Sequence, residues 1–501
     1  MKKIAILTIG LSIIVSLSYS QNEVDALRYS YTMPVGTARY TGMAGSFGAL
    51  GADPSTLIFN PAGIGVYKTS DISFTPSFEF NNSTTNYLDK TRSYEYFGMK
   101  FNHVSYIGTL PIYDELHNQH SYFNFGFSYN KLNSFNENII IDGQNYENSI
   151  TDYFAARANG IHPSMLYDED NFYSHLAYEQ YLINPVSPNA TNYVSAFNRY
   201  GERQKQLIER RGNQGEYNIA LSGNIQHKLF LGMSLGIQDI YFREVKTLEE
   251  NDPDDIIANF KSLRFKENLN TQGTGYNIKL GFLYSPVESL RIGAGFHTPT
   301  IINLHDDYST SLKGNFDYQY DKNDSETSLD GSYDYVLKTP AKFNASIAGI
   351  FEKFLINFDY ELVNYSKAQL RVKDSWGLNN SWGLNDDVFE YANENIDLIY
   401  KAVSNMKVGL EYREGMFKYR LGFGYFESPY KSNEINRNNY SMMYSAGLGF
   451  RFDDAYIDIG YSLLDNKDLY YNMYSGYGVE SPMAKINKTQ HRIAITFGVK
   501  F

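Results

Sequence analysis

Alternation between apolar and polar residues is the dominant pattern of the chain after residue 69. Over the final segment two sets of residues alternate, with His491, Ile493, Ile495, Phe497, Val499 and Phe501 on one side and Arg492, Ala494, Thr496, Gly498 and Lys500 on the other. A period of two places the sets on opposite faces of a β-strand. The pattern therefore predicts a strand that ends the chain on an aromatic residue, Phe501.

The same pattern recurs upstream, over residues 123–129, 229–238, 276–284, 354–362 and 417–425. One face of each segment is apolar or aromatic, and the other carries mostly small, polar or charged residues. A charge turned toward lipid would cost about 2–4 kcal/mol at mid-membrane, so we expect the charged faces to line a wet lumen. The division predicts an all-β fold, a transmembrane antiparallel β-barrel of about 14 strands after residue 69.

A soluble β-sandwich or adhesin is the alternative, because its strands alternate too. The apolar faces here have no complementary helices to cover them, and aromatic residues make up 16% of the chain, with 45 Tyr and 33 Phe. Such an aromatic excess suits the girdles at the two membrane interfaces of a barrel. The terminal Phe501 resembles the signal read by the outer-membrane barrel assembly machinery, which we expect as a partner during biogenesis.

Composition and charge exclude several classes of protein. The chain has no Cys, which excludes disulfide frameworks, thiolate zinc sites and iron–sulfur clusters. Its formal net charge of -12 argues against a nucleic-acid partner, because such proteins present a concentrated basic face. We expect no cofactor and no metal.

Residues 1–20 have the composition of a signal peptide. Two lysines precede an apolar stretch without charges over residues 4–15, and small residues stand just before Gln21. The stretch is short for a membrane anchor, and no basic cluster follows it. We therefore expect cleavage before Gln21, export, and no membrane-spanning helix afterwards.

Three segments are longer than membrane-crossing strands require, and we expect them to form extracellular loops: residues 131–215, 247–262 and 372–396. The first contains two stretches with a helical appearance, residues 173–181 and 195–211.

The third segment contains a tandem repeat, residues 375–379 and 381–385, which holds both tryptophans. Trp376 and Trp382 are candidates for contacting a substrate at the lip of the pore. The alternative is a tolerated loop expansion without a binding role.

Residues 21–68 break the alternation and are rich in Gly and other small residues. No Gly-Lys-Ser/Thr sequence and no dinucleotide fingerprint is present, so a phosphate-binding loop is excluded. Small residues without a strand pattern instead predict a compact plug inside the barrel, where the backbone approaches the wall closely. Asn60 and Pro61 suit a turn, and Gly63 is expected to be free to adopt a positive φ.

Here the sequence resembles a known family. The stretch from Gly48-Ala49-Leu50-Gly51-Ala52-Asp53-Pro54 to Asn60-Pro61-Ala62-Gly63 is similar to the N-terminal hatch of the FadL/TodX family of outer-membrane channels for fatty acids and hydrocarbons. Further segments resemble that family in order: residues 281–300, 339–342, 359–366, 408–413, 420–425 and 445–450. The resemblance covers nearly the whole mature chain, and the family's pocket residues cannot be placed beyond Asn60, Pro61, Ala62 and Gly63.

The resemblance implies a monomeric barrel (residues 69–501) in the outer membrane of a Gram-negative bacterium, plugged by a hatch (residues 21–68). A hydrophobic small molecule, with long-chain fatty acids as the leading candidate, would land on the loops and enter an apolar pocket against the hatch. It would leave into the membrane lipid through a lateral opening beside a kinked strand. Each buried methylene contributes about 0.8 kcal/mol, so an aqueous pore would offer such a molecule nothing. Asn60 is expected to anchor the hatch; the alternative is that Asn60 and Pro61 only end the plug.

Other functions remain as alternatives. The chain lacks a Gly-x-Ser-x-Gly elbow, and His297 is interpreted as a residue of the barrel rim, so we do not expect an enzyme. His117 and His120 could hold haem or a metal, although histidines in a polar loop are more often simply solvated. The other interpretations are a channel that takes up aromatic hydrocarbons or haem, and a non-specific porin or adhesin barrel.

Overall fold

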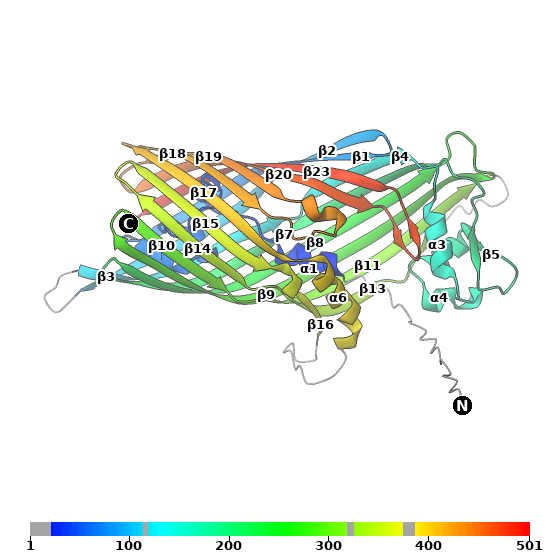
Figure 1. The fold of residues 1–501 in the computed structure, drawn as a ribbon, viewed down its shortest axis with the longest axis horizontal. Helices are drawn as coiled ribbons and strands as arrows, with labels where there is room; N and C mark the ends of the chain where they lie inside the picture. The colour runs from blue at the N-terminus through cyan, green and yellow to red at the C-terminus, as the bar shows by residue number, and fades with distance from the viewer. Residues whose placement is uncertain (1–21, 114–118, 318–324, 374–385) are drawn as a thin grey trace, which may run out of the picture.

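The structure is a computed structural model that describes residues 22–113, 119–317, 325–373 and 386–501. Its main sheet has 19 strand segments and closes where β23 pairs with β1. Four wall strands are each interrupted once, as β3/β4, β10/β11, β13/β14 and β15/β16, and β12 pairs only with β11. Within the described residues the wall is therefore an antiparallel barrel of 14 strands, as predicted (Figure 1).

The wall strands are β1 (Asp71–Tyr87), β2 (Lys90–Tyr113), β3 (Gln119–Ser134), β4 (Glu137–Gln144), β7 (Arg203–Ile225), β8 (Leu229–Asn251), β9 (Phe260–Val287), β10 (Leu290–His297), β11 (Ile301–Phe316), β13 (Gly331–Lys338), β14 (Lys342–Ile350), β15 (Phe354–Asn364), β16 (Gln369–Val372), β17 (Ala402–Glu414), β18 (Phe417–Phe426), β19 (Ser441–Arg451), β20 (Ala455–Asn472) and β23 (Met483–Lys500). The short strands are β5 (Ile183–Pro185), β6 (Tyr193–Ser195), β12 (Glu326–Thr327), β21 (Ser475–Gly476) and β22 (Val479–Glu480). The helices are α1 (Glu23–Ser30), α2 (Ala38–Gly42), α3 (Ile150–Ala158), α4 (Leu166–Glu169), α5 (Ser174–Glu179) and α6 (Glu390–Ile399). The 3-10 turns are η1 (Pro54–Ile58), η2 (Pro61–Val66), η3 (Pro163–Met165), η4 (Tyr365–Lys367), η5 (Asp386–Phe389) and η6 (Ile435–Asn438).

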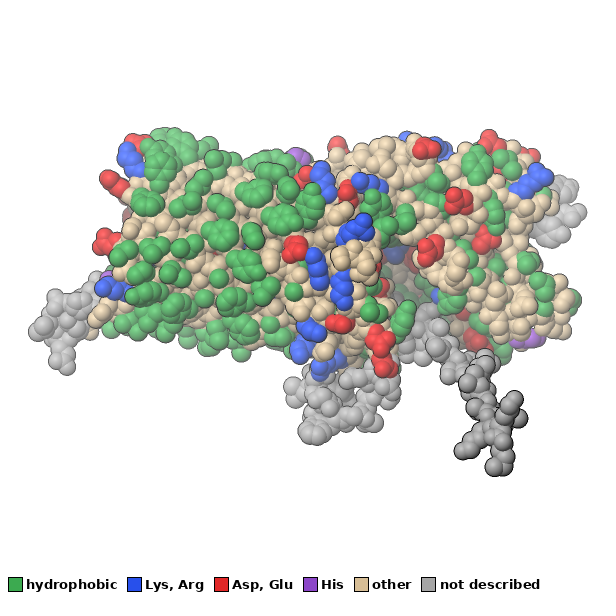
Figure 2. Space-filling model, in the orientation of Figure 1, with side chains coloured by type: hydrophobic (Ala, Val, Ile, Leu, Met, Phe, Trp, Pro, Cys, Tyr) green, Lys and Arg blue, Asp and Glu red, His purple; other side chains and the backbone are tan. Residues whose placement is uncertain are grey.

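The predicted alternation sets the two faces of the wall. On β23, Phe497 and Val499 are 48% and 49% exposed, whereas Arg492 and Thr496 are 3% and 0% exposed. The other five segments follow the same rule, and their outward side chains form an apolar belt over one half of the barrel (Figure 2). Within the described residues, no helix is long and apolar enough to cross a membrane.

The lumen is not the wet channel that the sequence predicts. The charged inward faces are packed: Arg420 is 2% exposed and Asp359 is fully buried. The reason is the plug, because the segment 22–68 lies inside the barrel, with α1, α2, η1 and η2 surrounded by the wall (Figure 1). We call this segment the hatch. Its first helix begins with a capping box, in which the Asn22 side chain accepts a hydrogen bond from the Val24 amide.

The two ends of the barrel differ. Around the C-terminus the described connections are short turns, such as residues 226–228, 288–289 and 415–416. We call this the turn end, and the opposite end the loop end (Figure 1). The apolar belt occupies the half near the turn end, and more polar and charged surface follows toward the loop end (Figure 2).

The predicted loop boundaries need correction. The first insertion is residues 145–202 rather than 131–215, because β4 and β7 extend well beyond the belt. The second is residues 252–259 rather than 247–262. In the third, residues 386–399 form η5 and α6, and the tandem repeat with Trp376 and Trp382 lies outside the described residues. The helix predicted over 173–181 is present as α5, but that over 195–211 is wrong, since β7 begins at Arg203.

Candidate functional site

Asn60 holds the centre of the hatch to the wall. Its side chain is 1% exposed, and its amide nitrogen donates to the Gly48 carbonyl at 2.7 Å and to the Phe282 carbonyl of β9 at 3.1 Å. Its amide oxygen accepts from the Ala62 amide at 3.2 Å and so starts η2. One side chain thus joins two parts of the hatch to one wall strand.

Two glycines of the wall make room for this turn, because they have no side chain. A Cβ atom on Gly281 of β9 would lie 2.3 Å from the Asn60 Oδ1, and one on Gly232 of β8 would lie 2.4 Å from the Ala62 nitrogen. Gly63 does not have a positive φ, contrary to expectation. Its small size is needed instead, because a Cβ there would lie 2.8 Å from Thr56.

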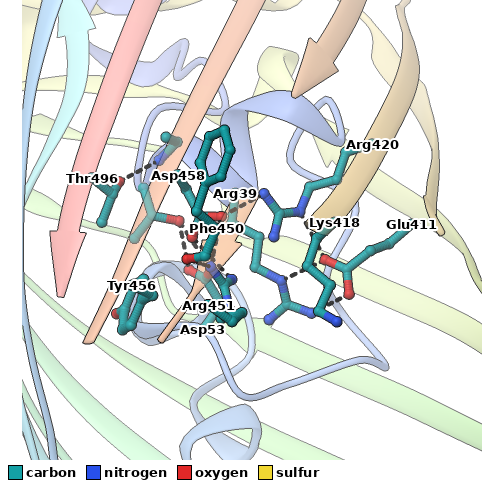
Figure 3. Close-up of polar contacts among 12 residues, drawn as sticks. Arg39, Asp53, Glu411, Lys418, Arg420, Phe450, Arg451, Tyr456, Asp458 and Thr496 are labelled. Atoms are coloured by element: carbon teal, nitrogen blue, oxygen red, sulfur yellow. Dashed lines mark hydrogen bonds and ion pairs between the residues drawn. The ribbon is translucent and has the colours of Figure 1, made fainter. Parts of the chain in front are cut away.

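A network of buried ion pairs fixes helix α2 to four wall strands on the turn-end side of the hatch (Figure 3). Arg39 of α2 pairs with Glu411 of β17 at 2.9 Å, and Glu411 also binds Arg420 of β18 at 2.7 Å. Arg420 binds Asp458 of β20 at 2.6 Å, and Arg451 of β19 binds the same carboxylate at 3.0 Å. Buried charges persist only when they are paired in this way, so the network demands one position for α2.

An inner cavity of about 80 Å³ lies on the other side of the hatch, between Pro34, Phe59 and the wall. Three lysines and two glutamates line it. Lys279 pairs with Glu216 at 2.5 Å, and Glu361 accepts from the Asn405 side chain at 2.9 Å. Lys407 lies 3.8 Å from the centre of the Phe59 ring and 3.8 Å from an Asp359 oxygen. Lys342 donates to the Thr32 hydroxyl at 2.6 Å, and no carboxylate among the described residues forms an ion pair with it. His297 is buried beside them and donates from Nε2 to the Phe59 carbonyl at 2.8 Å, so it is not a rim residue.

An outer cavity of about 290 Å³ lies between α1 and the part of the wall nearer the loop end. Its apolar lining includes Leu27, Phe135, Phe242, Leu469 and Ile486. Its cations are all neutralised. Arg28 pairs with Asp25, Arg210 pairs with Glu137 and Glu244, and Lys488 pairs with Glu137.

Beside both cavities the wall loses its hydrogen-bonded pairing. β2 pairs with β1 from Lys90 to Ile107, but with β3 only from His103↔Asn130 to Tyr113↔Gln119. Residues 90–102 of β2 therefore have no second strand partner among the described residues. β3 and β4 stay paired with β7 and turn inward, where the Asn136 carbonyl accepts from the Asn81 side chain at 2.6 Å. We call this interruption, between residues 90–102 and 131–144, the seam.

Side chains alone bridge the seam. The Arg211 guanidinium of β7 lies 5.1 Å from the centre of the Tyr96 ring of β2, and the Tyr96 hydroxyl donates to the Asn136 amide oxygen at 3.4 Å. The base of the seam is aromatic on the outside, where Phe101 stacks on Tyr129 at 6.3 Å. Leu132 lines the inner cavity and Asn133 to Phe135 line the outer one, so the seam separates both cavities from the surroundings of the barrel.

The insertion 145–202 forms a dome at the loop end, with α3 to α5 packed around a core that includes Phe154, Leu176 and Ile183 (Figure 1). At its junction with the barrel, Glu202 and Glu250 are both fully buried and share the Gln204 amide nitrogen, at 3.5 and 2.8 Å. Burial, and then the charge of Glu250, raise the pKa of Glu202 to about 9.

This pair predicts a dome that loosens as the pH rises. Between the ordinary value of 4.5 and about 9, the folded dome holds a proton on Glu202 that the unfolded segment has lost. Stability therefore falls with rising pH in that window. We expect proteolysis within residues 145–202 to be at least about fivefold faster at pH 9 than at pH 6. Glu202→Gln should weaken this dependence, and the remainder should come from Glu250, whose pKa burial raises to about 7; an equal dependence in that variant would contradict the assignment.

A protein-family model now identifies the chain. The model for outer membrane protein transport proteins (OMPP1/FadL/TodX) matches residues 213–501, more than half of the chain. The chain belongs to this family. As a FadL/TodX-family protein, it is a channel for hydrophobic substrates in the outer membrane of a Gram-negative bacterium. No curated protein sequence matches the chain.

Solved structures of other FadL/TodX-family proteins share the fold. A FadL homologue from Pseudomonas aeruginosa is 11% identical, with a TM-score of 0.56 over 94% of this chain and 100% of that one. The toluene transporter TodX from P. putida is 12% identical, with a TM-score of 0.52 over 94% of this chain and 99% of that one. At these identities the likeness extends to the plugged barrel and no further.

The residues predicted from the FadL/TodX signature lie together, but not all candidates can be located. Asn60, Pro61, Ala62 and Gly63 form the turn against β8 and β9, and their functional role stays a prediction. Trp376, Trp382 and His117 lie outside the described residues. Phe501 exchanges backbone hydrogen bonds with Ser70 and is 62% exposed. Sequence reasoning missed Lys342 and the bridging pair Tyr96 and Arg211, because their partners are distant in the chain.

Proposed function

We propose that this channel takes up amphiphilic carboxylates, with long-chain fatty acids as its substrates, by passive diffusion and without a chemical step. The observation that carries the proposal is Lys342, a cation in the inner cavity whose described partner is the neutral Thr32 hydroxyl. A partly buried ammonium that forms no ion pair with a described carboxylate favours an anionic ligand group, because the ligand then supplies a close opposite charge.

The contrast with the outer cavity supports this choice. There the cations already have carboxylate partners, and the remaining lining is largely apolar. An apolar chain fits the outer cavity, while a carboxylate head finds its complement only beside Lys342. An uncharged hydrocarbon would gain from the first cavity and nothing from Lys342.

The sizes of the cavities require the hatch to move. Pockets for small molecules commonly have volumes of about 300–1,000 Å³, and the outer cavity, at about 290 Å³, approaches that range. The inner cavity, at about 80 Å³, is far below it. A carboxylate that displaces Thr32 from Lys342 would shift the hatch next to Pro34 and enlarge the cavity. Lateral exit through the seam would then carry the molecule into the membrane lipid without returning it to water.

Neutralising Lys342 tests the substrate class. In cells without their own transporter, we expect Lys342→Met to lower uptake of radiolabelled oleate about tenfold or more, because a charge-assisted hydrogen bond contributes about 1.5–3 kcal/mol. Uptake of labelled toluene should change little. Lys431→Met, a lysine outside both cavities, is the matched control and should leave oleate uptake unchanged.

Equal losses for oleate and toluene would contradict carboxylate recognition and would return the aromatic hydrocarbons as the leading substrates. Absence of oleate uptake by the unmodified protein, folded in the outer membrane, would discard fatty acids altogether. Haem uptake or a non-specific porin would then be tested by haem-dependent growth and by ion conductance.

A further inference from the structure

The kink of β3 begins at a β-bulge centred on Leu132. Against β7, Lys131 pairs with Gly215 but Asn133 pairs with Gln214, so β3 has one residue more than its partner there. Alternation also fails at this point, because Asn130, Lys131 and Leu132 are all buried. A bulge of this kind bends a strand and turns a side chain to the other face.

The bulge brings Lys131 into the barrel. Phe127 and Tyr129 point outward, so an uninterrupted β3 would place Lys131 outward as well, facing lipid near the aromatic base of the seam. A charge is strongly disfavoured there. With the bulge, Lys131 is 2% exposed and its ammonium lies 2.7 Å from a carboxylate oxygen of Glu79.

Glu79 binds both ends of the bent segment. This residue of β1 is fully buried, and its Oε1 accepts from Lys131 while its Oε2 accepts from the Ser134 hydroxyl at 2.9 Å. From the other side, Arg492 of β23 donates to Oε1 at 3.2 Å. Ser134 in turn accepts from the Asn136 side chain at 3.0 Å, just before β4. A single carboxylate therefore fixes both the start and the end of the departure of β3 from β2.

We propose that Glu79 is the positioning residue of the seam: its carboxylate holds Lys131 and Ser134 inside the barrel and so keeps β3 from pairing with β2. The inference rests on the proposed function in one respect, that substrate leaves through the seam. Without the carboxylate, two cations, Lys131 and Arg492, face each other in a buried place. The bent segment then leaves the lumen and moves toward the wall.

Spin labels test this movement directly, and the absence of native Cys makes labelling specific. One label is placed at Asn133 in the bent segment and the other at Ile356 of β15, nearly opposite in the order of wall strands. In Glu79→Gln we expect the distance between the labels to lengthen, and oleate uptake to fall roughly tenfold. A control pair, Phe127 and Ile356, should keep its distance, since Phe127 precedes the bulge.

Two further variants keep the test decisive. Lys131→Met removes the charge that cannot face lipid and should lengthen the same distance, even if Glu79→Gln assembles poorly. Glu79→Asp keeps the charge and should restore part of the uptake. An unchanged distance between the Asn133 and Ile356 labels in both Glu79→Gln and Lys131→Met would overturn the proposal. A longer distance with normal uptake would uphold the positioning role and instead contradict exit through the seam.

Discussion

We expect oleate uptake to fall to the level of cells lacking the protein when the seam is closed covalently. Tyr96→Cys and Arg211→Cys replace two of the side chains that bridge it, while the Arg92–Asp142 ion pair stays in place, and a short bismaleimide then joins β2 to β7. The native ring and guanidinium meet across the seam at 5.1 Å, so the linker takes the place of a contact between the same two positions. Because residues 90–102 have no described strand partner on that side, the link would restrain the part of the wall that is otherwise joined only by side chains.

The control link joins strands that are already paired. Leu221 of β7 and Met233 of β8 are direct partners in the sheet, and their side chains are 46% and 51% exposed. A bismaleimide between cysteines at these positions should leave uptake unchanged. The doubly substituted protein without linker should retain transport. Normal uptake after complete linking of positions 96 and 211 would exclude the seam as the exit.

Replacing Asn60 by alanine should lower oleate uptake about tenfold while the barrel still assembles. The substitution leaves the carbonyl groups of Gly48 and Phe282 without their described side-chain donor, and each unsatisfied buried group costs about 1–3 kcal/mol. The wall itself keeps its ladder of backbone hydrogen bonds. Heat-modifiable electrophoretic mobility reports assembly, and uptake of radiolabelled oleate reports function.

Asn433→Ala, at an exposed position outside the hatch, is the matched control for this experiment. Both variants should reach the outer membrane in equal amounts. If Asn60→Ala transports oleate at the normal rate, Asn60 and Pro61 only end the plug. If it raises ion conductance as well as lowering uptake, the hatch has lost its position, as the three hydrogen bonds of Asn60 would require.

The faces of the wall could be predicted because lipid imposes them. Residues such as Phe497 and Arg492 cannot exchange faces without a large cost, so alternation survives in the sequence wherever a strand crosses the belt. Beyond the belt that constraint ends. The outer part of β7 can be polar on both faces, and the charges of residues 203–211 were therefore open to a helical interpretation.

The kink left a signal that sequence reasoning did not use. The alternation that places Phe127 and Tyr129 outward also assigns Lys131 to the lipid face, a conflict that a bulge resolves. Its partner Glu79 could not be found in this way, because the two residues meet only when β1 and β3 are both in place. Lys342 could not be singled out from the sequence either. It matters because it forms no ion pair with a described carboxylate, and that is visible only in the folded structure.

The position of the hatch also constrains the order of assembly. Helix α2 packs against β18, β19, β20 and β23, whereas η2 packs against β7, β8 and β9, so strands from both halves of the chain enclose it. The cylinder closes only when β23, the last strand to be synthesised, pairs with β1, the first. The hatch must therefore be enclosed before or during that final pairing. During biogenesis of this protein the sheet therefore closes around the hatch, which precedes every wall strand in the sequence. Closure without the hatch would leave the buried charges of β17 to β20 facing an empty lumen.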